Sequence, residues 1–332
     1  MSLSQIPREV RQKIFDLAIC SPVAPPACPS VSQEGRERMS RNSYDGGGIW
    51  NLKPQNPALS LLLVNKQFHD EVQHVLKHVA SDYHVDIMFV KEYGLWLTWT
   101  VPVLPQTQYI NSIEATFRIF DPADDLDSRF QHTLDFRGGD GGPESAIWSF
   151  YGLLTNVMER GPGFLGHEGD YVVKNISINV LSPSDGAAHY NLAFKDVHPS
   201  EMTREEKRRR RYPIKGVFRD ESTPPEDRLT EYITKSLSMV LHIGYHTMKY
   251  GMALWESIQE SIVISTNGKE HRRFDVEKLV QDYDPRYWGE TPEFIVDRRD
   301  KYRQWREWLD ERRQAMKEGK ELDGNPPVTY IM

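Results

Sequence analysis

The chain of 332 residues is poor in cysteine and has no long apolar run. Its two cysteines, Cys20 and Cys28, are too few for a disulfide framework or for a zinc site built on cysteine alone. No apolar run approaches the roughly twenty residues that span a bilayer, and the first residues do not resemble a secretory signal peptide. We therefore expect an intracellular protein, nuclear or cytoplasmic, with reduced thiols and no membrane segment.

The common sequence signatures of enzymes are also missing. No G-x-G-x-x-G or G-K-[ST] sequence follows a strand, and neither Gly-x-Ser-x-Gly nor His-Glu-x-x-His occurs. His74 and His78 have the spacing of two metal ligands on a helix, but a third ligand is not evident. The sequence thus predicts no cofactor, no metal and no catalytic residue. An enzyme whose site is assembled from distant residues is the alternative.

Charge is nearly balanced, with 41 Lys and Arg against 48 Asp and Glu. The net charge of −7 excludes a global electrostatic attraction to nucleic acid or acidic lipid. One local run of cations stands out: Lys207, Arg208, Arg209, Arg210 and Arg211. Clustered cations contact phosphates or acidic receptor grooves, so this run predicts nuclear import or phosphate contact. The alternatives are an inert loop, neutralised by nearby acidic residues, and a nuclear nucleic-acid-associated protein that uses residues 207–215.

Two amphipathic stretches open the chain. In the first, Pro7 suits the opening turn of a helix. Its apolar residues recur at steps of four and three, in the stripe Ile6, Val10, Ile14, Leu17 and Ala18. The second stretch runs from Pro57 to Val79 and predicts one helix with the stripe Leu61, Val64, Phe68, Val72, Val75 and Val79. Each helix must bury its stripe, and each is the other's nearest candidate partner.

Further along the chain, alternating apolar residues predict three strands, which contain Ile113, Ile176 and Ile262. Helical sequence separates them, which is typical of crossover connections and a largely parallel sheet. The predicted fold class is therefore α/β, with a small, largely parallel sheet and crossover helices. We expect a helical module over 1–82 with a mobile insertion at 21–55, a body over 83–292 with flexible loops at 121–142 and 183–225, and a charged helix with a frayed tail over 293–332.

The two opening stretches resemble the small helical module of F-box-like proteins, as it occurs in many fungal proteins. The first half of the likeness rests on Leu3, Pro7, Glu9, Ile14, Phe15 and Leu17, and the second on Leu63, Val64, Asn65, Lys66, Gln67 and Phe68. The triplet Glu9-Val10-Arg11 also looks like the first Glu-x-Arg motif of a related two-motif fungal domain. The second motif of that domain is absent here.

The resemblance implies a non-catalytic, protein-binding adaptor. Its N-terminal helices would dock on the linker subunit of a cullin-type ubiquitin ligase, and its body would select a target protein. The residues implied in linker contact are Pro7, Ile14, Phe15 and Leu17. The residues implied in holding the second helix against the first are Leu63, Val64 and Phe68. The alternative is that all these side chains pack only onto the α/β body of the same chain.

Overall fold

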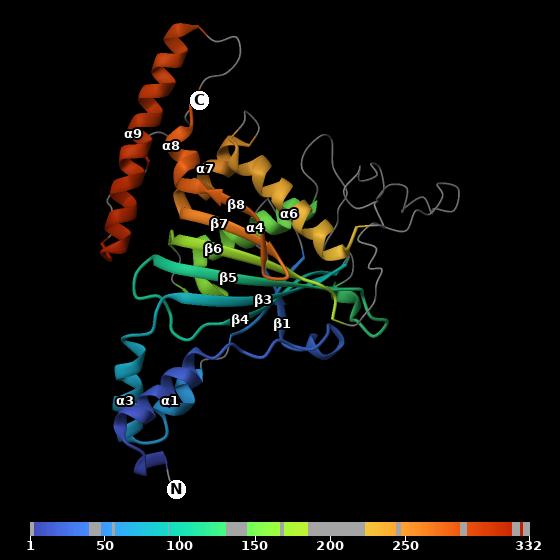
Figure 1. The fold of residues 1–332 in the computed structure, drawn as a ribbon, viewed down its shortest axis with the longest axis vertical. Helices are drawn as coiled ribbons and strands as arrows, with labels where there is room; N and C mark the ends of the chain where they lie inside the picture. The colour runs from blue at the N-terminus through green and yellow to red at the C-terminus, as the bar shows by residue number, and fades with distance from the viewer. Residues whose placement is uncertain are drawn as a thin grey trace.

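The computed structural model describes residues 3–39, 48–54, 57–91, 93–130, 145–166, 169–184, 223–243, 247–285, 291–320 and 326–327. Within these ranges the chain has an α/β fold built on one eight-stranded sheet (Figure 1). The strands are β1 (Arg36–Arg38), β2 (Ile49–Leu52), β3 (Asp82–Val90), β4 (Gly94–Thr100), β5 (Tyr109–Phe120), β6 (Val172–Leu181), β7 (Ile258–Thr266) and β8 (Lys269–Asp275). The helices are α1 (Arg8–Cys20), α2 (Pro57–Leu62), α3 (Lys66–Leu76), α4 (Ser145–Arg160), α6 (Pro225–Leu241), α7 (Met248–Ser257), α8 (Val276–Asp282) and α9 (Pro292–Lys317).

The sheet is mostly parallel at its centre. Its strand order is β1-β2-β4-β3-β5-β6-β7-β8, and the pairs β3/β5, β5/β6 and β6/β7 are parallel. Ile113, Ile176 and Ile262 lie in one row across β5, β6 and β7, which confirms the largely parallel arrangement predicted from their repeated pattern. The sheet is larger than predicted, because β4 and β8 add antiparallel pairs beside β3 and β7. The β7–β8 turn is the pair Asn267-Gly268, and both residues have positive φ.

One face of the sheet is covered by α4, α6 and α7. Alternation along β5 points Ile113, Ala115 and Phe117 to this side, because successive strand residues face opposite ways. These side chains meet Phe150 of α4 and Leu237 of α6 in the main hydrophobic core. The core therefore lies between the sheet and its helices, as in most α/β proteins.

The opposite face is covered in part by residues 21–39, which lie in the predicted mobile insertion. The described part of this segment is joined to the sheet, because β1 pairs with β2 and β2 pairs with β4. Trp50 of β2 packs with Met88, Trp96 and Phe130 in a second core on this face. Every residue of β4 is consequently buried, which explains why its sequence shows no alternation. Residues 40–47 of the insertion lie outside the described residues.

Helix α9 packs on the body through Tyr302, Trp305 and Leu309, which are all buried. Arg312 is buried as well, together with its neighbour Arg313. Both guanidinium groups donate to backbone carbonyls at the end of α7, where the negative end of the helix dipole favours cations. The two arginines therefore hold α9 on the body, so residues 293–320 do not form a separate unit.

At the N-terminus, α1, α2 and α3 form a helical module that lies apart from the helices of the body (Figure 1). Its hydrophobic core is a separate cluster from the main core and consists of the buried side chains Phe15, Ile19, Ala58, Phe68, Val72 and Val75. The single helix predicted from Pro57 to Val79 is wrong, because the chain breaks between α2 and α3. Oδ1 of Asn65 accepts a hydrogen bond of 2.9 Å from the backbone N–H of Phe68 and thereby caps the start of α3.

Candidate protein-binding site

The centre of the helical module is an aromatic contact between α1 and α3. Phe15 is 1% exposed and Phe68 is 7% exposed. Their rings meet edge to face, with centroids 5.2 Å apart, an arrangement that aromatic pairs favour. Phe15 was expected to contact a partner. It is instead enclosed by its own module, so it positions α1 and presents no contact surface of its own.

A buried ion pair fixes the rotation of α1 against α3. Nε of Arg11 donates to Oε2 of Glu71 over 2.9 Å, and Nη2 donates to Oε1 over 2.5 Å. Both side chains are 6% exposed. The guanidinium lowers the pKa of the Glu71 carboxyl, and Gln67 donates a further hydrogen bond to the same carboxylate. A planar, two-point contact of this kind is geometrically strict, so it dictates which side of α1 faces α3.

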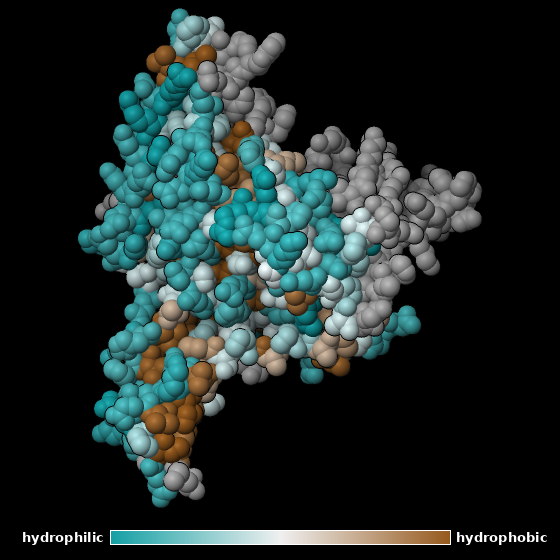
Figure 2. Space-filling model, in the orientation of Figure 1, coloured by the Kyte–Doolittle hydropathy of each residue, from teal (hydrophilic) through white to brown (hydrophobic). Residues whose placement is uncertain are grey.

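The fixed rotation leaves a second apolar stripe of α1 at the surface. Val10 is 50% exposed, Ile14 is 36% exposed and Leu17 is 57% exposed. They lie about 140° around the helix from Phe15 and its buried neighbours. The stripe that the sequence predicts as the inner face of α1 is therefore its outer face. Figure 2 shows hydrophobic residues gathered on this part of the module. Val10 and Leu17 are at least half exposed, and Ile14 is exposed over about a third of its surface.

The turn between α2 and α3 adds further exposed apolar side chains. Leu63 is 76% exposed and Val64 is 56% exposed, so neither holds the second helix against the first, contrary to expectation. The reason is the break at Asn65, which turns the chain away from the predicted stripe before α3 begins. Pro7 is exposed directly before α1. The module thus carries exposed apolar residues on α1 and on the following turn.

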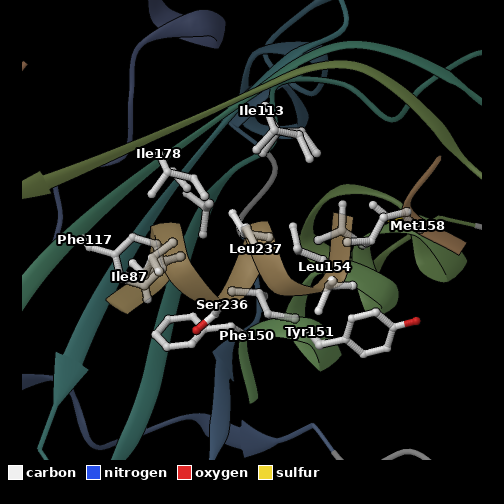
Figure 3. Close-up of a pocket in the computed structure, with 18 of the residues that line it drawn as sticks. Ile87, Ile113, Phe117, Phe150, Tyr151, Leu154, Met158, Ile178, Ser236 and Leu237 are labelled. Carbon is white, nitrogen blue, oxygen red and sulfur yellow. The ribbon is translucent and has the colours of Figure 1, made fainter. Parts of the chain in front are cut away.

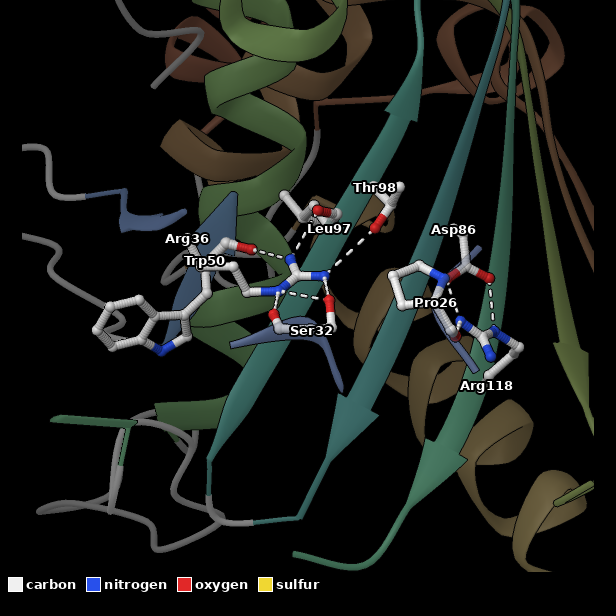
Figure 4. A network of polar contacts seen from close by, with 8 residues as sticks. All are labelled: Pro26, Ser32, Arg36, Trp50, Asp86, Leu97, Thr98 and Arg118. Atoms are coloured by element: carbon white, nitrogen blue, oxygen red, sulfur yellow. Dashed lines mark hydrogen bonds and ion pairs between the residues drawn. The ribbon is translucent and has the colours of Figure 1, made fainter. Parts of the chain in front are cut away.

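The body gains rigidity from a buried arginine that the sequence pattern did not single out. Arg36 of β1 is 1% exposed. Its Nη1 donates to the carbonyl oxygens of Trp50, over 3.1 Å, and Leu97, over 2.8 Å (Figure 4). Its Nε donates to the carbonyl of Ser32 over 2.7 Å. Burial lowers the pKa of Arg36 to about 10. This cation therefore ties the segment before β1 to two neighbouring strands.

A second arginine binds the segment of residues 21–39 at another position, Pro26. Arg118 of β5 forms a two-point ion pair with Asp86 of β3, with nitrogen–oxygen distances of 2.7 and 2.6 Å. Its Nη2 also donates to the carbonyl of Pro26 over 2.8 Å (Figure 4). The strap of residues 21–39 is thus bound across the sheet at both positions. The connection between the module and the body is consequently part of the folded body.

The main core encloses a cavity of about 60 Å³ between the sheet and helices α4 and α6 (Figure 3). Its lining is apolar apart from the hydroxyl-bearing residues Ser236 and Tyr151. The Ser236 hydroxyl already donates to the carbonyl of Tyr232 within α6. Ligand sites usually measure several hundred Å³ and contain convergent polar groups. This cavity therefore supplies neither the room nor the acid, base or nucleophile of an active site.

Other chemically notable groups serve the fold. Burial raises the pKa of Glu256, whose carboxylate accepts a hydrogen bond of 2.9 Å from Nε1 of Trp305 and so links α7 to α9.

The rings of His74 and His78 lie on the surface of α3, with their centroids 4.7 Å apart. Among the described residues, no group of three or more His, Cys, Asp or Glu is arranged to hold a metal ion. Nor does any described helix combine the length and apolarity needed to cross a membrane.

The cationic run Lys207–Arg211 lies outside the described residues, so the structure places none of its side chains. Comparison of the chain with known protein families, with characterised proteins and with solved structures gives no match. The candidate site therefore rests on the geometry of the chain itself, and its principal feature is the exposed stripe of α1, Val10, Ile14 and Leu17.

Proposed function

We propose that the chain is a non-catalytic adaptor that binds a protein partner through the N-terminal module. The partner proposed is the linker subunit of a cullin-type ubiquitin ligase, which the F-box-like resemblance implies. The body then holds a target protein. The observation that carries this proposal is the second apolar stripe of α1, which stays exposed although the module already has a core of its own.

A partner that covers the exposed stripe of α1 removes apolar surface from water. Burying apolar surface stabilises a complex by about 25 cal/mol per Å². Amphipathic helices that bind proteins present apolar side chains at steps of three and four, as Val10, Ile14 and Leu17 do. The stripe is rigid before binding, because Phe15 and the Arg11–Glu71 pair hold the helix from the other side. A preorganised surface loses less entropy on association.

The proposal is tested by titrating the purified linker subunit into the intact chain and into an Ile14→Asp/Leu17→Asp variant. Both side chains are exposed, so the variant is expected to fold, and circular dichroism checks this. Two central contacts worth about 2 kcal/mol each predict a loss of affinity on the order of a thousandfold. The matched control is Phe294→Asp/Val296→Asp on α9, whose side chains are 62% and 59% exposed.

We expect the control to bind as tightly as the intact chain. Two outcomes would contradict the proposal: no binding of the linker subunit by the intact chain, or equal affinity of the intact chain and the Ile14→Asp/Leu17→Asp variant.

A further inference from the structure

The parallel strands β5, β6 and β7 have one face that the described helices leave open. Parallel sheets are ordinarily covered on both faces. Here α4, α6 and α7 cover one face, and the strap of residues 21–39 reaches the other only as far as Arg118 of β5. In Figure 1 no described helix lies in front of β5, β6 and β7. This uncovered part is named the open face.

The open face is hollowed. A depression of about 630 Å³ lies over β5, β6 and β7 and extends to β8 and the start of α8. Ser177 of β6 and Val263 of β7 form its floor, in the same row as Glu114 of β5. Asp275 and Glu277 border the opposite side. The hollow is large enough to receive several side chains of another molecule.

The side chains around the hollow carry an excess of negative charge. Its carboxylates are Glu114, Glu260, Asp275 and Glu277, and its cation is Arg273. The Arg273 guanidinium is engaged by Glu270, with Nη2 and Oε2 2.6 Å apart. Glu260 is paired with Lys174, with Oε1 and Nζ 3.4 Å apart, and Nδ1 of His84 lies 3.1 Å from Oε2 of Glu114. The excess repels anionic ligands such as nucleic acid and attracts cationic ones.

The arrangement of the carboxylates selects among cationic ligands. In the described residues no three such groups converge to hold a metal ion. Glu114 and Asp275 lie on strands three spacings apart, about 14 Å across the sheet, and Asp275 is displaced by two residues from the row of Glu114. The carboxylates are therefore spread over the hollow, which suits several cations of one peptide better than a single ion. No aromatic side chain lines the hollow, so a sugar or a base finds no ring on which to stack.

We propose that the open face binds a segment of the target protein that is rich in Lys or Arg. This inference rests on the proposed adaptor function, because it assigns a chemistry to the target that the body holds. Ser177 on the floor offers its hydroxyl group to the peptide backbone, and the carboxylates of Glu114, Asp275 and Glu277 pair with the cations of the peptide.

The test measures the fluorescence anisotropy of a labelled seven-residue peptide with Lys at alternate positions and Ser between them. The full chain is compared with a Glu114→Gln/Glu277→Gln variant, in which both changes lie in the hollow. The matched control is Asp297→Asn/Glu311→Gln, which removes the same charge from exposed positions of α9. We expect the hollow variant to bind about tenfold more weakly than the full chain, and the control to bind as tightly.

The inference is overturned if the peptide does not bind the full chain at low salt, or if both variants weaken binding equally. The Ile14→Asp/Leu17→Asp variant separates this result from the adaptor proposal, because it is expected to lose the linker subunit while keeping full affinity for the peptide. Loss of peptide binding in that variant would also overturn the assignment, since it would place the peptide on the module.

Discussion

Replacing Phe15 with alanine should unfold the N-terminal module while the body stays folded. The Phe15 ring is 1% exposed and packs against Phe68, so its removal leaves a cavity in the module core. Phe→Ala changes in cores cost about 3–5 kcal/mol. The module helices have only 13, 6 and 11 residues, and cores of such small units rarely contribute more than about 3–5 kcal/mol. The free energy of unfolding that the variant is expected to lose is therefore as large as the whole stability of the module.

Hydrogen–deuterium exchange followed by mass spectrometry tests this expectation, because it reports the protection of the module and of the body separately. Peptides from α1 and α3 should lose protection in the Phe15→Ala variant, whereas peptides from β5 and β6 should keep it, because the two cores are separate clusters. Leu17→Ala is the matched control on the same helix. Its side chain is exposed, so its effect should stay within about 0.5 kcal/mol. Equal loss of protection in α1 and β5 would refute an independent module core.

Two further predictions concern the body. Ala115→Val adds two methyl groups at the wall of the 60 Å³ cavity, and filling it completely would stabilise the fold by about 1.4 kcal/mol at roughly 24 cal/mol per Å³. Urea denaturation should show a gain in the free energy of unfolding of up to that size. A decrease in the free energy of unfolding would contradict the position of the cavity. Glu256→Gln should raise Tm more at pH 7 than at pH 4. Because burial raises the pKa of Glu256 above its ordinary 4.5, the ionised carboxylate weakens the fold, and protonation relieves this as the pH falls through the raised value. A Tm gain independent of pH would contradict this assignment.

Local signals were sufficient to predict the centre of the sheet. Alternating apolar residues in three isoleucine-rich segments predicted the strands β5, β6 and β7. Their equivalent isoleucines are paired across the sheet, because each strand buries the face that carries them. β4 was missed because burial on both faces removes alternation. The β7–β8 hairpin was missed although Asn267-Gly268 is a strong turn signal. β1 and β2 lie in a segment rich in Pro and Gly. β1 pairs with β2, and β2 pairs with β4, where Leu95 follows its partner Ile49 by more than forty residues in the chain.

The orientation of α1 could not be predicted from the helix alone. Two stripes on it are apolar, and periodicity favours the one that contains Ile14 and Leu17. The decisive residue is Arg11, a cation that any local pattern assigns to the surface. It is buried because Glu71, 60 residues away in sequence, supplies its counter-charge. Likewise Arg36 is buried by backbone carbonyls that only the assembled sheet brings together.

The most direct measurement of the central claim is site-specific photocrosslinking to the linker subunit. A benzophenone side chain is placed at the position of Leu17 on the exposed stripe, and in a second preparation at the position of Val296 on α9. We predict that the first crosslinks the linker subunit and the second does not. Crosslinking from the Val296 position alone, or from neither position, would contradict the assignment of the α1 stripe as the partner-binding surface.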